Sequence, residues 1–398
     1  MTQDWETCSL ADICEIQSTL VDPRESRHLD LPHVGAGNIE SGTGRVQAIQ
    51  SAREEELISG KFHFDDSVVL YSKIRPYLMK VARPDFSGLC SADIYPLAPK
   101  PGRAERDFLF YMLLTDSFTE YAIRGSARAG MPKVNRDHLF AYKTRTPPIA
   151  EQRRIVAILD EAFAGIATAK ANVEKNLRNT REWSARQLAT ALGAASAGGR
   201  SDALEKLVAP SCTLSYGIVQ PGDEVSGGLP VVRPVDLGDK TVYADGLKRI
   251  DPALARSYAR TTLEGNDLLL CVRGTTGTVA IADPTLAGAN VTRGIVPIRF
   301  DPQTISQALG YYLLRSEPVQ AQIRAKTYGT ALMQINIGDL RKIVIAFPPL
   351  EEQAALVEKL DAIQEAADQL ADIYARKLAA LDELKRSLLH QAFTGGLS

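Results

Sequence analysis

Apolar residues recur along residues 349–392 at alternating spacings of four and three, the pattern of a helix that packs along one seam. Residues 148–192 carry a related pattern 201 positions earlier. We therefore predict two long helices that pair with each other as an antiparallel coiled coil. The matched seam positions are Ile155, Leu159, Ala162, Ile166, Ala169, Val173, Asn176, Thr180, Trp183 and Gln187 in the first helix, and Leu356, Leu360, Ile363, Ala367, Leu370, Tyr374, Lys377, Leu381, Leu384 and Leu388 in the second.

One interruption of the seam falls at the same place in both helices, at Asn176 and at Lys377. A polar residue in such a seam fixes the register of pairing at some cost in stability. We assign both residues to helix pairing. Each helix follows a Pro-Pro pair that begins at Pro147 or Pro348, as expected because proline is tolerated at a helix start.

The same offset of 201 relates Asn135 to Asn336 and Gln152 to Gln353, outside the seams. The segments before the two helices both mix short β-like runs with helical stretches: the runs are 67–71 and 267–272, and the stretches are 108–114 and 308–323. A repeat of about half the chain predicts two similar modules. The expected fold class is α+β: two mixed α/β modules separated by two long paired helices, with a pseudo-twofold internal repeat.

These patterns divide the chain into five segments. They are a first module (1–147), a first helical spacer (148–193), a linker (194–200), a second module (201–348) and a second helical spacer (349–398). The linker region is rich in alanine, glycine and serine, so its composition predicts flexibility.

The bulk composition is that of a soluble globular protein, with 398 residues, of which 45% are hydrophobic and 24% charged. The acidic start predicts no signal peptide, and the lack of an 18-residue apolar run predicts no membrane span. The five cysteines form no Cys-x-x-Cys pair, which favours a reduced, cytoplasmic location.

The formal net charge of −2 is unusual for a protein that binds nucleic acid. No segment of the chain is strongly basic. Any affinity for DNA must therefore come from local patches or from partner subunits.

The chain lacks the sequence motifs of common enzymes. It has neither a Gly-x-x-x-x-Gly-Lys-[Ser/Thr] phosphate loop nor a Gly-x-Gly-x-x-Gly fingerprint. His28 and His33 have no cysteine or carboxylate cluster at metal-ligand spacing. Glu151 and Glu352 lie in the first helical turn, where a carboxylate interacts with the helix dipole. We expect no catalytic residue, no metal site and no cofactor bound by this chain.

Two loops in each module combine cations with aromatic, glycine or hydroxyl residues, which bind phosphates and base edges. A solvated hairpin turn and a mobile connecting loop remain alternative interpretations of these segments. Asn135 and Asn336 fit a turn cap better than a base contact. The candidate DNA-binding residues are Lys73, Arg75, Tyr77, Lys80, Arg124, Arg128 and Lys133 in the first module, and Arg273, Thr275, Thr276, Arg324, Lys326, Tyr328 and Gln334 in the second.

Several segments together resemble the specificity subunit of Type I restriction–modification systems. They lie in both halves, so the resemblance covers essentially the whole chain. The segments are the duplicated Pro-Pro-[Ile/Leu]-x-Glu-Gln before each long helix, Ser72-Lys73-Ile74-Arg75-Pro76-Tyr77, Tyr216-Gly217-Ile218-Val219-Gln220-Pro221-Gly222-Asp223-Glu224, Arg273-Gly274-Thr275-Thr276-Gly277 with Gly288-Ala289-Asn290, and Ala392-Phe393-Thr394-Gly395-Gly396-Leu397.

The resemblance implies a non-catalytic subunit with two target-recognition domains, each of which reads one half of an asymmetric, bipartite site in double-stranded DNA. The paired helices would set the unread spacer and dock two DNA adenine methyltransferase (modification) subunits. Those partners would use S-adenosylmethionine, and further restriction/translocase subunits would use ATP and Mg.

Three other readings stay open. The helices and modules could belong to a protein-docking adaptor that does not bind DNA. The chain could serve a relative of these systems that only methylates. A self-contained DNA-modifying enzyme is disfavoured by the missing motifs.

Overall fold

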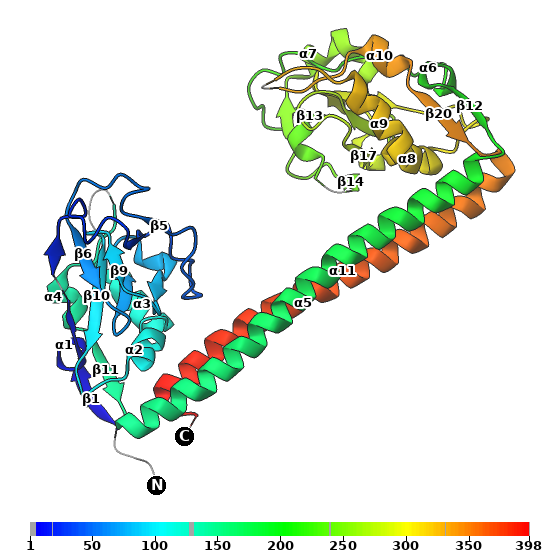
Figure 1. Cartoon of the computed structure of the whole chain (residues 1–398). Coiled ribbons are helices and arrows are strands. Elements are labelled where there is room, and N and C mark those ends of the chain that lie inside the picture. Colours follow the sequence, from blue (N-terminus) through cyan, green and yellow to red (C-terminus); the bar gives the residue numbers. More distant parts are fainter. Residues whose placement is uncertain (1–4, 18, 127–130, 239, 331, 398) are drawn as a thin grey trace. The chain divides into compact units, whose positions relative to one another are not determined.

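The structure is a computed structural model that describes residues 5–17, 19–126, 131–238, 240–330 and 332–397. The chain forms two compact units, which are residues 1–175 with 374–398 (unit 1) and residues 176–373 (unit 2). Two long helices, α5 (Ile149–Ser196) and α11 (Leu350–Thr394), each contribute one part to each unit (Figure 1). The units therefore divide within the helices rather than at the ends of the modules.

The module of unit 1 contains three small sheets, with strand orders β1-β11, β2-β10-β7-β8 and β3-β6-β9-β4-β5. Its neighbouring strands pair antiparallel, apart from the parallel pair β4 and β9. The strands are β1 (Glu6–Ser9), β2 (Cys14–Ile16), β3 (Leu20–Val21), β4 (Pro32–Val34), β5 (Gln50–Ser51), β6 (Lys61–Phe64), β7 (Val69–Ser72), β8 (Val81–Ala82), β9 (Gly88–Cys90), β10 (Ile94–Pro99) and β11 (Lys143–Thr146). The helices are α1 (Leu10–Ile13), η1 (Pro76–Leu78), α2 (Arg106–Met112), α3 (Asp116–Arg124) and α4 (Arg136–Phe140).

The core of this module forms around β7, every residue of which is buried. The Val-Leu-Tyr run of this strand matches the preference of β-branched and aromatic residues for buried strands. Tyr71 meets Phe118 of α3 edge to face, with the ring centroids 5.4 Å apart. The ring centroids of Phe108 on α2 and Phe393 near the end of α11 are 4.9 Å apart, so the core also includes the last turns of α11.

The module of unit 2 also combines small sheets with short helices. Its sheets have the strand orders β12-β20, β15-β13-β18 and β14-β17-β16-β19. The strands are β12 (Arg200–Ala203), β13 (Leu229–Val232), β14 (Thr241–Val242), β15 (Lys248–Ile250), β16 (Leu268–Cys271), β17 (Val279–Ala282), β18 (Asn290–Val291), β19 (Ile295–Ile298) and β20 (Val344–Phe347). The helices are α6 (Leu204–Leu207), η2 (Pro234–Asp236), α7 (Pro252–Ala255), η3 (Arg256–Thr261), η4 (Pro284–Leu286), α8 (Gln307–Arg315), α9 (Glu317–Lys326) and α10 (Ile337–Arg341).

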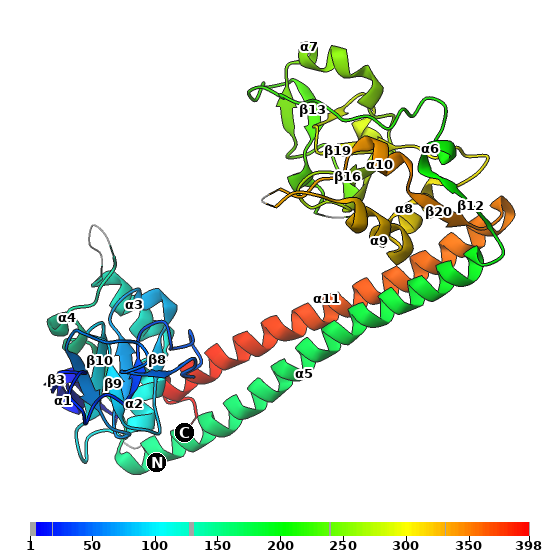
Figure 2. The same cartoon turned by 45° about the horizontal axis from the view of Figure 1, so that its top comes forward.

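Within each unit the portions of α5 and α11 lie side by side (Figures 1 and 2). In unit 1, Ile155 and Leu159 of α5 share a buried cluster with Leu389 and Ala392 of α11. Further along, Lys170 of α5 forms an ion pair with Asp382 of α11. These contacts place the beginning of α5 beside the end of α11, so the two portions run in opposite directions.

In unit 2, the end of α5 meets the start of α11 in the same way. Leu192 of α5 shares a buried cluster with Leu356 and Leu360 of α11. The predicted seam is buried at some positions, such as Leu356 and Leu360. It is exposed at others, since Trp183 and Leu384 are 43% and 46% exposed.

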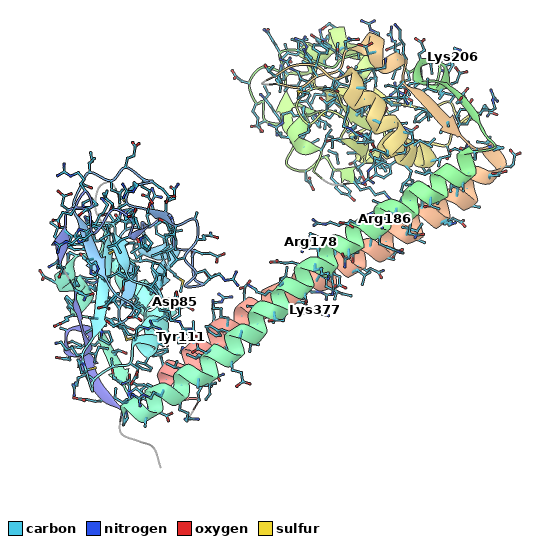
Figure 3. The ribbon with its side chains drawn as sticks, viewed as in Figure 1. Asp85, Tyr111, Arg178, Arg186, Lys206 and Lys377 are labelled. Carbon is cyan, nitrogen blue, oxygen red and sulfur yellow. The ribbon has the colours of Figure 1, made fainter. Side chains whose placement is uncertain are left out.

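The two residues assigned to register, Asn176 and Lys377, are both exposed. Figure 3 shows Lys377 on the surface of α11, and its ammonium lies 5.8 Å from the centre of the Tyr374 ring. A polar residue that selects register is usually enclosed in the seam. Their role in pairing therefore stays a prediction.

The predicted linker 194–200 differs from the structure. Helix α5 continues through Gly193 to Ser196, and β12 begins at Arg200. Alanine favours helix strongly enough for the small-residue segment to extend α5. The helical stretch predicted in the second module is instead two helices, α8 and α9, separated at Ser316.

Candidate nucleic-acid interface

In the first module, the two candidate loops, 73–80 and 124–133, meet through their backbones. Ile74 and Lys133 form an antiparallel bridge, and the amide of Arg75 donates to the carbonyl of Pro132 at 3.0 Å. The amide of Val134 donates to the carbonyl of Lys73 at 2.8 Å. Two segments far apart in the sequence therefore form one surface.

The second module joins its two candidate loops, 271–278 and 324–334, in the same manner. Arg273 and Gln334 form an antiparallel bridge, and the amide of Gly274 donates to the carbonyl of Met333 at 2.8 Å. The hydroxyl of Thr276 also donates to the carbonyl of Met333, at 3.1 Å. Each module thus presents one surface built from a pair of loops.

Loop 73–80 has an unusual backbone that exposes two of its side chains. Arg75 and Met79 both adopt left-handed conformations, with φ values of 51° and 47°, on either side of η1. Such conformations cost a non-glycine residue about 1 kcal/mol each, so the surrounding contacts must hold them. Pro76 is buried between them, while Arg75 and Tyr77 are exposed. This backbone presents a cation and an aromatic ring to solvent.

The lysines of this surface are bound to the protein itself. Lys73 donates to the carbonyl of Ala92, and its ammonium lies 4.9 Å from the centre of the Tyr95 ring. Burial, and then the neighbouring charge of Lys133, lower the pKa of Lys73. Lys80 donates to the carbonyl of Ala36.

The remaining candidate DNA-binding cations of the first module differ in their surroundings. Lys133 forms an ion pair with Asp93 at 3.7 Å. Arg124 is exposed at the end of α3. Arg128 lies outside the described residues. Of the described candidates, Arg75 and Tyr77 are thus best placed to touch a ligand, and Arg124 lies at the margin.

The surface of the second module is less charged. Thr275 is exposed, and Arg273 is half-buried beside it. Tyr328 is 49% exposed, and its backbone pairs with that of Gln334 through two hydrogen bonds of 2.9 Å. This surface offers hydroxyls and an aromatic ring.

The two remaining candidate cations of the second module, Arg324 and Lys326, both lie on α9. Arg324 forms an ion pair with Glu317 of the same helix. Lys326 is half-buried at the end of that helix. The two modules therefore present different chemistry from similar loop pairs.

The two repeated asparagines cap helices, as the turn-cap interpretation suggested. The side-chain oxygen of Asn135 accepts from the amide of His138 at 2.8 Å, at the start of α4. Asn336 accepts from the amide of Asp339 at 2.8 Å, at the start of α10. Each cap follows directly after a loop of the candidate surface, and so fixes where that loop ends.

The contacts that fix each module to its helix could not be read from the sequence. Gln152 is fully buried; its side-chain oxygen accepts from the amide of Glu105 at 2.8 Å, and its nitrogen donates to the carbonyls of Arg103 and Pro147. Gln353 makes the equivalent three bonds, to Ser306, Thr304 and Pro348. The repeated Pro-Pro-[Ile/Leu]-x-Glu-Gln motif ends in these two glutamines. The sequence, however, suggested a structural role only for the glutamate before each glutamine, as a partner of the helix dipole.

A second matched contact lies eight residues, or a little more than two turns, further along each helix. The hydroxyl of Tyr111 donates to Asp160 of α5 at 2.6 Å, and Arg83 forms an ion pair with the same carboxylate. Figure 3 shows Tyr111 on the side of its module that faces α5. In unit 2, the hydroxyl of Tyr312 donates to Asp361 of α11, which also pairs with Lys240 at 3.2 Å. Each candidate surface is therefore carried by a module with two polar attachments to a helix.

Within the described residues no group of histidine, cysteine and acidic side chains is arranged to hold a metal ion. His33 instead bonds Glu55 at 2.8 Å, and His28 bonds the carbonyl of Asp22 at 2.9 Å. No helix in the described part of the chain is long and apolar enough to cross a membrane.

Comparison with known proteins identifies the family. The Type I restriction modification DNA specificity domain matches residues 2–177 and 223–375. The EcoDI specificity subunit of Escherichia coli is 36% identical over 179 residues, which are 44% of this chain and 38% of that protein. The EcoBI specificity subunit of the same organism is 24% identical over 274 residues, 63% of this chain and 58% of that protein. These two matches each span less than two thirds of the E. coli protein.

Other similarities cover nearly the whole chain. The putative MjaX specificity subunit of Methanocaldococcus jannaschii is 22% identical over 416 residues, covering 99% of this chain and 93% of that protein. A solved chain from work on complex assembly and conformational transition of the type I R-M system has a similar fold, with a TM-score of 0.79, 24% identity and 99% coverage of both chains. The HsdS subunit from Thermoanaerobacter tengcongensis gives a TM-score of 0.60 at 22% identity, covering 98% of this chain and 97% of that one. Because the specificity domain matches most of its residues, this chain belongs to the family of type I restriction–modification specificity subunits.

Proposed function

We propose that this chain is a non-catalytic subunit that selects a bipartite site in double-stranded DNA, with one half-site read by each module. The observation that carries this proposal is the pair of joined loops in each module, 73–80 with 124–133 and 271–278 with 324–334. Hydrogen bonds between the two loops of each pair hold their described parts against each other, which suits a defined recognition surface. The different side chains on the two surfaces suit an asymmetric site.

The first surface offers Arg75 and Tyr77, which suit contacts to guanine edges, phosphates and sugars. The second offers Thr275 and Tyr328, whose hydroxyls can donate to or accept from either kind of base. Because few cations are free on the described loops, we expect partner subunits to supply much of the phosphate contact. The modest charge of the chain is consistent with that division of labour.

We further propose that the chain arose as an internal repeat and that α5 and α11 pair as an antiparallel coiled coil. The matched attachments of Gln152 and Gln353 support the repeat, since both make three equivalent hydrogen bonds to a module. The oppositely directed contacts of the helices support the coiled coil. In this proposal the helices set the length of unread DNA and dock two adenine methyltransferase subunits.

The reaction chemistry is assigned to those partners, which would bind S-adenosylmethionine. Restriction subunits that use ATP and Mg would complete a cleaving assembly, and a methylation-only relative would lack them. The experiment that tests this proposal compares DNA binding and methylation by this chain alone, by methyltransferase subunits alone, and by both together. We expect site-specific methylation only from the combination.

Two results would contradict the proposal. Methylation by the isolated chain would make it an enzyme. A complex that forms with the methyltransferase subunits but shows no preference for any DNA sequence would make the chain a docking adaptor.

A further inference from the structure

A tight turn in the first module lies against the candidate loop 73–80. This turn, residues 39–46, is closed by an antiparallel bridge between Ile39 and Val46. The amide of Gly42 donates to the carbonyl of Met79 at 3.1 Å, and the hydroxyl of Ser41 donates to the carbonyl of Leu78. The turn therefore binds the end of η1, the segment that carries Tyr77.

The other side of the turn is bound to the helix pair of unit 1. The ammonium of Lys385, on α11, donates to the carbonyl of Gly42 at 2.6 Å. The same ammonium lies 5.1 Å from the centre of the Phe163 ring on α5. Burial lowers the pKa of Lys385, which agrees with a side chain enclosed between the helices and the module. A hydrogen bond from a charged donor is about twice as strong as one between neutral groups.

The turn also packs closely on α2. Gly44 has a φ of +80°, and a Cβ atom added there would lie 2.5 Å from the ring of Phe110 on α2. Gly42 also has a left-handed φ, of +67°. One peptide segment thus accepts from α11, donates to loop 73–80 and packs closely on α2.

We infer that Lys385 is a positioning residue for DNA recognition by the first module, because it fixes through Gly42 the segment that presents Tyr77. This inference rests on the proposed function, in which loop 73–80 touches DNA. Helix α11 would then help the first module to read its half-site.

The second module is held differently, which gives the inference its specificity. The position 201 residues before Lys385 is Ser184, whose hydroxyl donates to the carbonyl of Arg181 in its own helix at 3.1 Å. Loss of the Lys385 contact should therefore change recognition of one half-site only.

The test uses the full chain reconstituted with its methyltransferase subunits and a random-sequence DNA library. Methylated positions are identified by single-molecule sequencing, for wild type, Lys385→Met, Lys385→Arg and Lys359→Met. Lys359 is the matched control because it is an exposed lysine on the same helix. Hydrogen exchange at the amide of Gly42, which donates to Met79, reports whether the turn stays bound to η1 when Lys385 no longer holds the carbonyl of Gly42.

We expect Lys385→Met to accept altered bases in one half-site roughly tenfold more often, which is the effect of losing one hydrogen bond to a charged group. The other half-site should keep its stringency, and exchange at Gly42 should accelerate while the core strands stay protected. Lys385→Arg should restore most of the stringency, and Lys359→Met should behave as wild type.

The inference is overturned if Lys385→Met keeps both half-sites unchanged, or if it relaxes both equally. The variant Arg75→Ala separates this failure from a failure of the proposed function. If Arg75→Ala changes the target and Lys385→Met does not, only the positioning role is lost. If Arg75→Ala and Tyr77→Ala also leave the target unchanged, the loop does not read DNA and both proposals fail.

Discussion

Replacement of Gln152 by methionine tests how the first module is fixed to its helix. The change keeps the volume of the side chain approximately but removes its amide. The amide accepts from the backbone of Glu105 at 2.8 Å and donates to the carbonyls of Arg103 and Pro147 at 3.1 and 2.9 Å. The side chain is fully buried, so water cannot replace these partners without local rearrangement.

The expected cost follows from these three bonds. A typical hydrogen bond contributes about 1 kcal/mol net, and a buried partner left unpaired adds to this. We therefore expect unit 1 to lose about 3 kcal/mol, a large part of the 5–15 kcal/mol that usually stabilises a folded domain. The same reasoning applies to Gln353→Met in unit 2.

The two tryptophans allow each unit to be followed separately. Trp5 packs against the core of unit 1, and Trp183 lies in unit 2. Guanidinium unfolding followed by fluorescence in a Trp183→Phe background therefore reports unit 1. Gln391→Met, at an exposed position of α11 within unit 1, is the matched control.

We expect Gln152→Met to unfold at a lower guanidinium concentration than wild type, as followed by Trp5 fluorescence. The unfolding midpoint of the control should not change. A loss of less than about 0.5 kcal/mol, the usual range for a surface change, would refute the claim that this glutamine fixes the module.

Three further predictions concern individual residues. Arg75→Ala should weaken DNA binding by the assembled complex and lower the slope of log K against log salt by up to about 1, measured by titration at several salt concentrations; an unchanged slope would remove this residue from phosphate contact. Gly217→Ala should destabilise unit 2 by about 3 kcal/mol, because a Cβ there would lie 2.0 Å from the backbone oxygen of Val291; an unaltered unfolding midpoint would contradict this. Asp267→Ala should cost about 3 kcal/mol in the same assay, because Asp267 is fully buried and pairs with Arg299 at 2.6 Å; a neutral effect would mean that the arginine finds another partner.

The sequence predicted the long helices because their apolar spacing is regular over many turns. Their ends were harder to place: alanine-rich residues 193–196 read as a linker but extend α5. Composition does not distinguish a flexible small-residue segment from a helix that continues. The short β-like runs at 67–71 and 267–272 predicted the strands β7 and β16 to within two residues.

The candidate loops were visible in the sequence, but their joining was not. The bridge between Ile74 and Lys133 links residues far apart in the chain, and no local pattern predicts such a pairing. The sequence also could not rank the candidate DNA-binding cations, because their surroundings in the folded protein differ. Lys73 and Lys80 donate to backbone carbonyls of their own module, whereas Arg75 is exposed by a left-handed backbone. That conformation carries no sequence signal, because it is held by tertiary contacts.

Division of the target between the two modules is the central claim, and a comparison of two substitutions tests it most directly. Single-molecule sequencing of DNA methylated by reconstituted complexes would be carried out for Tyr77→Ala and for Thr275→Ala. The account predicts that the first relaxes one half of a two-part site, that the second relaxes the other half, and that the spacer between them keeps its length. Relaxation of the same half by both substitutions, or a target with no second half, would contradict it.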